Sequence, residues 1–173
     1  MEASGTWLKR LADVVGMMAF FPLLMLISYF TELVGLAFAL HLYFVLTTAL
    51  AAAFLWSVRW PNPKKALLSG AIMGVSSALM IAALTPVPAA GTLSNLGTVA
   101  SMLVIGLYAH DVAKVSGLKK LDRFGGLVVL GSFLVVIRES FIVLVAMLLL
   151  SLGLGGVSQY LRVALALAKA RDK

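Results

Sequence analysis

Residues 64–88, KKALLSGAIMGVSSALMIAALTPVP, decide the class of fold to which this chain belongs. Between the two lysines and the Thr-Pro-Val-Pro turn, the stretch from Ala66 to Leu84 contains no charged side chain. Its length approaches the roughly 20 apolar residues that an α-helix needs to cross a bilayer. The sequence therefore predicts a membrane-spanning helix here, with a surface turn after it.

The rest of the chain repeats this pattern. Its 173 residues are 62% hydrophobic and only 12% charged, whereas soluble domains are nearer half apolar and a quarter charged. We therefore expect an all-α membrane protein, a polytopic bundle of about six transmembrane helices that forms one integral membrane domain over residues 1–173. The expected spans cover residues 14–30, 33–56, 66–84, 96–113, 127–150 and 157–170.

Prolines and glycines predict where the helices bend or end. Pro22 should bend the first span, because proline removes a backbone hydrogen bond and crowds the preceding turn. Gly153, Gly155 and Gly156 are expected to end the fifth span. The helix after them, 157–170, is short, so it is expected either to cross the membrane or to lie flat at the interface as an amphipathic helix.

The positions of the cations predict the orientation. Apart from Arg138 and Arg162, every Lys and Arg falls at a terminus, in the 59–65 loop or in the 114–123 loop. Six spans place all of these on one side of the membrane, whereas five would place the C-terminal ones on the other side. The positive-inside rule therefore favours six spans in a multi-pass cell-membrane protein with both termini in the cytoplasm. This explains the net charge of +7 without a nucleic-acid partner.

Small residues recur every four positions in the third span. Residues of this size let another helix approach closely, so we interpret the row as a helix-packing face. The sequence leaves open whether the partner helix belongs to the same chain or to another chain. The row consists of Ala66, Gly70, Gly74, Ala78 and Ala82.

A few polar residues fall inside the expected spans. Arg138 and Glu139 lie near the middle of the fifth span, Arg162 at a comparable depth could pair with Glu139, and His41 is a further candidate. Charges inside a bilayer are costly and usually face a partner or a polar cavity. Three interpretations remain open: a pathway or binding site for an ion or small solute, an ion pair that fixes helix docking, or a span broken near Arg138.

Most catalytic and metal chemistry is excluded. The absence of cysteine removes disulfides, thiolate metal sites and cysteine nucleophiles. No hydrolase, zinc-protease or phosphate-loop motif occurs, so we predict no catalytic residue, metal ligand or cofactor. His41 and His110 are expected on the order of 15 Å apart along the membrane normal, which argues against a haem shared between them.

These observations favour a small non-enzymatic membrane protein. We expect it to act as a subunit or self-assembling component of a membrane complex, with the lipid bilayer and other subunits or further copies of itself as partners. The alternative is a transporter or channel subunit for a small solute or ion that uses the polar cluster. In size, span number and small-residue content of its third span, the chain loosely resembles the substrate-binding components of energy-coupling-factor vitamin transporters, although no specific motif carries that resemblance.

Overall fold

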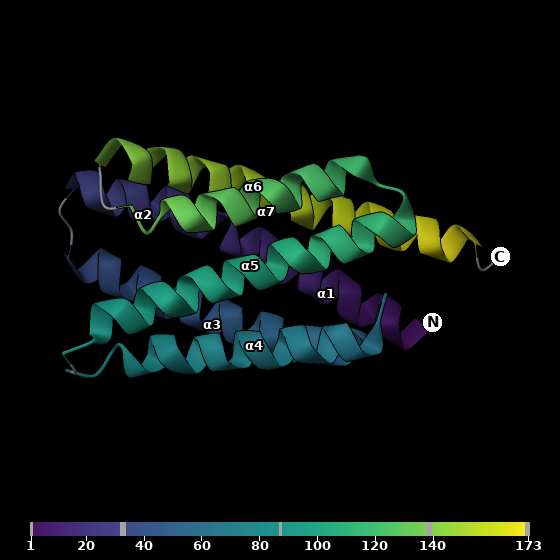
Figure 1. Cartoon of the computed structure of the whole chain (residues 1–173), viewed down its shortest axis with the longest axis horizontal. Coiled ribbons are helices and arrows are strands. Elements are labelled where there is room, and N and C mark those ends of the chain that lie inside the picture. The colour runs from purple at the N-terminus through teal and green to yellow at the C-terminus, as the bar shows by residue number, and fades with distance from the viewer. Residues whose placement is uncertain (1, 32–33, 87, 138–139, 172–173) are drawn as a thin grey trace.

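The computed structural model describes the whole chain except residues 1, 32–33, 87, 138–139 and 172–173. Its described residues form an all-α bundle without strands (Figure 1). Within the described part, five helical stretches are long and apolar enough to cross a membrane, and the shorter α6, with 16 residues, packs alongside them. The helices are α1 (Glu2–Met18), α2 (Phe20–Thr31), α3 (Val34–Val58), α4 (Pro63–Ala82), α5 (Ala90–Ser116), α6 (Lys119–Leu134) and α7 (Ser140–Arg171).

The helices run back and forth along the long axis of the bundle (Figure 1). The first and last described residues lie at the same end, which we call the terminal end, together with the α3–α4 and α5–α6 connections. The packing order closes into a ring in which α1 contacts α3, followed by α4, α5, α6 and α7, and α7 returns to α1. The α2 helix continues the first span between α3 and α7.

Local sequence explains the tight turns at the terminal end. Asn62 caps α4, because its side-chain oxygen accepts hydrogen bonds from the backbone N–H groups of Lys64 and Lys65, and Pro63 occupies a first-turn position that tolerates proline. Gly117 ends α5 with φ 73°, a left-handed conformation that favours glycine. The chain therefore reverses direction within a few residues.

The bend predicted at Pro22 is present as a break between α1 and α2 at Ala19. Proline has no N–H group, so the helical hydrogen-bond ladder is interrupted here. Side chains from two other helices bond to carbonyls beside the break. The Tyr43 hydroxyl donates to Met17 O at 2.9 Å, and the Ser151 hydroxyl donates to Ala19 O at 2.8 Å.

The predicted end of the fifth span at Gly153–Gly156 was wrong. The α6 helix ends at Leu134, and α7 then runs without interruption from Ser140 through these glycines, so the last helix has 32 residues and is not a short interfacial segment. A Cβ on Gly153 would lie 2.9 Å from Val128 N, and a Cβ on Gly156 would meet the Phe124 ring. Close packing against α6 therefore outweighs the weak helix propensity of glycine.

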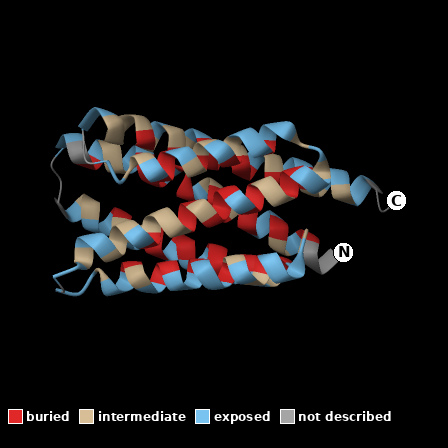
Figure 2. Cartoon of the chain, viewed as in Figure 1, coloured by how far each residue is buried: buried red, intermediate tan, exposed pale blue. Residues whose placement is uncertain are grey.

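The core and the outer surface are both apolar. Figure 2 shows buried residues along the inner faces of the helices and exposed residues on the outside. Phe44, Met73 and Met102 are fully buried, whereas Phe30 and Phe141 are 69% and 76% exposed. Large apolar side chains on the outside suit a protein whose surrounding solvent is lipid.

Candidate functional site

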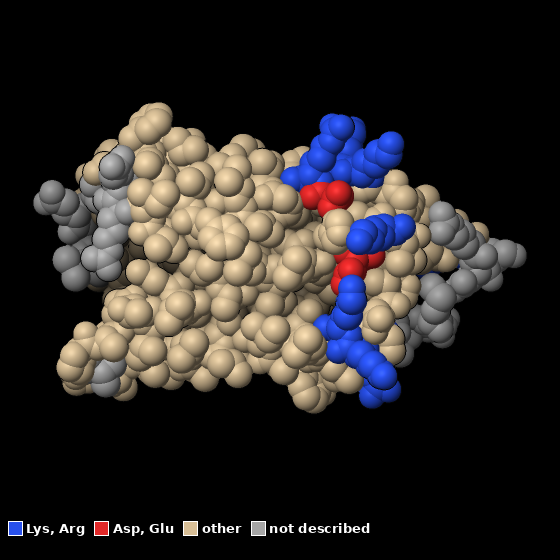
Figure 3. Space-filling model, viewed as in Figure 1, with Lys and Arg blue, Asp and Glu red and all other residues tan. Residues whose placement is uncertain are grey.

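Charged side chains gather at the terminal end of the bundle. On the face drawn in Figure 3 they form a band near that end, and the rest of the described surface on this face carries no charge. The charged residues whose side chains the structure describes are Lys9, Arg10, Asp13, Arg59, Lys64, Lys65, Asp111, Lys114, Lys119, Lys120, Asp122, Arg123, Arg162 and Lys169.

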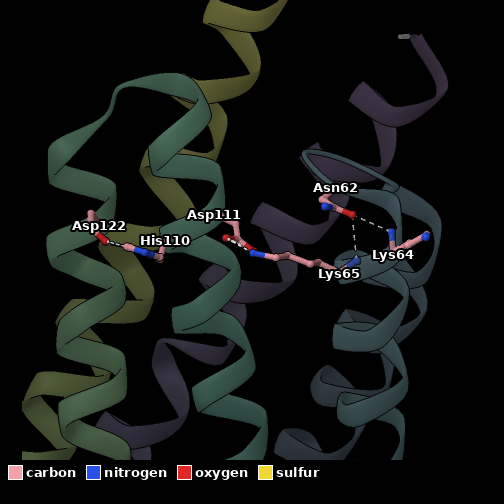
Figure 4. Close-up of polar contacts among 6 residues, drawn as sticks. All are labelled: Asn62, Lys64, Lys65, His110, Asp111 and Asp122. Atoms are coloured by element: carbon pink, nitrogen blue, oxygen red, sulfur yellow. Dashed lines mark hydrogen bonds and ion pairs between the residues drawn. The ribbon is translucent and has the colours of Figure 1, made fainter.

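Two ion pairs and one histidine–carboxylate contact join neighbouring helices within this band. Lys65 Nζ lies 2.9 Å from Asp111 Oδ1, which links α4 to α5. His110 Nδ1 lies 2.6 Å from Asp122 Oδ1, which links α5 to α6; Figure 4 shows both contacts. Arg162 Nη2 lies 2.8 Å from Asp13 Oδ1, which links α7 to α1. At least one partner of each pair is more than 40% exposed, so each contributes about 1 kcal/mol or less to stability.

The structure describes only part of the predicted intramembrane cluster. Arg138 and Glu139 lie outside the described residues. Arg162 pairs with Asp13 of α1. Its predicted pairing with Glu139 stays a prediction, because Glu139 lies outside the described residues. The helix expected over 127–150 is interrupted, because α6 ends at Leu134 and α7 begins at Ser140. This interruption fits the interpretation of a span broken near Arg138.

His41 stands apart from these ion pairs. It lies in the first half of α3, half-buried, and its Nε2 atom is 3.4 Å from the carbonyl oxygen of Met80 in α4. This contact gives the half-buried ring a polar partner on the neighbouring helix. His110 pairs with Asp122 instead, so the two histidines belong to separate environments.

The first half of the predicted packing face of α4 lies against another helix of the chain, and the second half lies on the outer surface. Ala66 and Gly70 are buried, and a Cβ on Gly70 would lie 2.9 Å from Trp56 N of α3. Gly74, Ala78 and Ala82 are exposed, and a Cβ on Gly74 would meet nothing within 4 Å. Because four residues exceed one helical turn by about 40°, a row at this spacing winds around the helix and leaves the α3 contact.

The polar residues buried in the described part of the bundle are all Ser or Thr. Several donate to carbonyls of their own helix, such as Thr47 to Tyr43 O at 3.0 Å and Ser77 to Met73 O at 3.0 Å. Ser158 instead reaches across to Ala12 O of α1 at 2.6 Å. Thr48 Oγ1 is buried with no hydrogen-bond partner. The described interior is therefore a packed apolar core with scattered hydroxyls.

Two grooves open on the outer surface. The first, about 340 Å³, lies between α2 and α7 and is almost wholly apolar. The second, about 420 Å³, lies between α5 and α6 and has the His110–Asp122 pair in its wall. Sequence reasoning missed both, because each depends on which helices become neighbours. The first is lined by Met25, Leu26, Phe30, Ser140, Phe141, Val143, Leu144 and Met147, and the second by Gly106, Leu107, His110, Asp122, Gly125, Gly126, Val129, Leu130 and Phe133.

Comparison with known proteins adds no functional assignment. The chain matches no family model, and no curated protein or solved structure shows significant similarity to it. Within the described ranges, no three His, Asp or Glu side chains stand close enough together to hold a metal ion. The candidate sites therefore rest on the geometry of the bundle itself.

Proposed function

We propose that this protein is a non-enzymatic membrane subunit that self-assembles through the outer face of α4. The observation that carries this proposal is a run of small exposed residues on that helix. Within the chain, α4 packs chiefly against α3 and α5, which leaves its remaining face directed outward. That face includes Ala71, Gly74, Ala78 and Ala82.

The physical argument concerns how closely two helices can approach in lipid. Lipid tails are as apolar as leucine, so helices associate through van der Waals contact and not through exclusion of water. Small residues permit this contact because they bring the two backbones together. Elsewhere the outer surface carries large side chains such as Phe20, Phe38 and Phe141. Large residues of α4 such as Leu68 and Ile81 are also exposed, so the proposed contact with a second copy is confined to the strip of small residues.

The interior supports a structural role over a solute pathway. The described buried polar groups are hydroxyls scattered over several helices, and the described charges stand at the terminal end. The same charge distribution supports insertion as a multi-pass cell-membrane protein with both termini in the cytoplasm, since Lys and Arg are retained on that side. A transporter subunit remains the alternative if Arg138 and Glu139 serve a polar path.

Cysteine cross-linking tests the proposal directly, because the chain has no cysteine of its own. A single Ala78→Cys change should give an oxidised dimer in native membranes. Leu148→Cys on α7, where the side chain is 41% exposed, is the matched control and should stay monomeric. Equal cross-linking of both variants would indicate random collision and would contradict the proposal.

A second variant pair separates assembly from folding. Gly74→Leu places bulk on the proposed contact, where a Cβ meets nothing within the chain. We expect the purified protein to keep its thermal stability but to shift toward monomer in native mass spectrometry. The control, Val163→Leu on α7, enlarges an apolar side chain that is already 42% exposed and should leave the oligomeric state unchanged.

A further inference from the structure

The groove between α5 and α6 is built on a close approach of two glycines. A Cβ on Gly125 would lie 2.9 Å from the carbonyl oxygen of Gly106, so the two backbones touch along the floor of the groove. Gly126, the next residue, faces outward, and a Cβ there would meet nothing within 4 Å. The result is an open cleft of about 420 Å³.

The dimensions of the groove match one acyl chain. Its α6 wall runs from Asp122 to Phe133, a helical rise of about 16 Å. The hydrocarbon of one bilayer leaflet is about 15 Å thick, half of the full core. Val129, Leu130 and Phe133 make the deeper wall apolar, and the polar His110–Asp122 pair closes the end nearer the terminal end of the bundle.

Two lysines stand beyond the polar end. Lys114 follows His110 by one helical turn on α5, and Lys119 precedes Asp122 by about one turn on α6, so each shares a helix face with a groove residue. Both lysines are exposed, and neither pairs with a carboxylate within the described part of the chain. Asp122 is already engaged by His110. An anionic group above the groove would therefore meet positive charge.

We propose that this groove binds one anionic phospholipid. One acyl chain lies over Gly126 along the apolar wall, and the headgroup phosphate sits between Lys114 and Lys119. The positive charge at one end selects an anionic headgroup over a neutral one, and the length of the apolar part suits one acyl chain. The site uses α5 and α6, so it stands independently of the assembly proposed for α4.

Native mass spectrometry of the full-length protein tests the site. The protein is released from bilayers made of equal parts phosphatidylglycerol and phosphatidylcholine, and the retained lipids are identified by mass. In the Lys114→Gln/Lys119→Gln variant, we expect affinity for phosphatidylglycerol to fall about thirtyfold, because each lysine near an anionic surface contributes about fivefold. Weak retention of phosphatidylcholine should be unchanged.

Gly126→Leu tests the acyl-chain part of the site. The leucine fills the cleft without meeting the protein's own atoms at Cβ, so retention of phosphatidylglycerol should be lost while thermal stability is kept. Undiminished retention would overturn the proposal. A change in oligomeric mass in place of lipid loss would overturn it too, because the groove would then hold a second copy of the chain.

The matched control for charge is Lys9→Gln/Lys64→Gln. It removes the same charge from two exposed lysines on α1 and α4 at the same end of the bundle. Retention of phosphatidylglycerol should stay within twofold of the unmodified protein. An equal loss in this control would show attraction to the overall positive surface and would overturn the specific site.

Discussion

The Ser158 hydroxyl of α7 lies directly against Gly16 of α1. It donates a 2.6 Å hydrogen bond to Ala12 O, and a Cβ added to Gly16 would stand only 2.8 Å from Ser158 Oγ. The missing side chain of Gly16 therefore makes room for the hydrogen bond that joins the first helix to the last. Small residues and hydroxyls at one contact are typical of helix pairs in membranes.

This contact predicts strong coupling between the two residues. Ser158→Ala alone should lower the free energy of unfolding by about 0.6 kcal/mol, the usual worth of such a hydrogen bond. Gly16→Ala alone should cost about 1 to 3 kcal/mol, because the new methyl group clashes with Oγ. In the Ser158→Ala background the nearest remaining atom is Ser158 Cβ at 3.5 Å, an ordinary contact, so Gly16→Ala should cost much less there.

The check is a double-mutant cycle measured by denaturant titration in mixed micelles. Additive effects of the two substitutions would show that α1 and α7 do not meet at these residues.

Adjacent glycines on α6 should respond in opposite ways to the same change. Gly125→Ala places a methyl group 2.9 Å from Gly106 O, a backbone atom that cannot step aside, so about 1 to 3 kcal/mol of stability should be lost. Gly126→Ala meets nothing and should raise stability by up to about 1 kcal/mol, because alanine favours the helix more than glycine does. Thermal unfolding of the two variants compares them directly, and a similar loss in both would place the α5–α6 contact elsewhere.

Neighbouring threonines in α3 offer a test of the interior. Thr48 Oγ1 is buried without a partner, so Thr48→Val should raise stability by about 1 kcal/mol because it removes an unsatisfied polar atom at nearly constant volume. Thr47 Oγ1 bonds to Tyr43 O and Phe44 O, both at 3.0 Å, and Thr47→Val should instead cost about 0.5 to 1.5 kcal/mol. Destabilisation by Thr48→Val would mean that its hydroxyl has a polar partner in the membrane.

The Arg162–Asp13 pair should contribute little to the free energy of unfolding, but the effect of each charge should depend on the other. Asp13→Asn should lower the free energy of unfolding by about 1 kcal/mol or less, because both side chains are about half exposed and screened by solvent. Asp13→Arg should cost more through repulsion. Reversal of the pair, Asp13→Arg with Arg162→Asp, should restore most of that loss. If the reversed pair shows no recovery of stability in unfolding measurements, the contact between α1 and α7 at Asp13 and Arg162 is contradicted.

The sequence by itself determined that lipid surrounds most of this protein and that its charges gather at one end of the bundle. Long uncharged stretches such as 66–84 must satisfy their backbone groups internally in lipid, so they form helices wherever they lie. Cations placed at both termini and in two loops gather at one end when each span reverses the chain, and Pro22 marks a break because the loss of its N–H group is a local effect.

Only the tertiary structure decided where the last two helices separate and which faces meet. Gly153 and Gly156 look like helix breakers in a one-dimensional pattern, yet α7 passes through them because they admit Val128 and Phe124 of α6. The pairing of Asp13 with Arg162 and the α5–α6 groove arise from helices distant in the sequence. Local propensity is a weak preference, and packing between remote segments overrides it wherever two backbones come into contact.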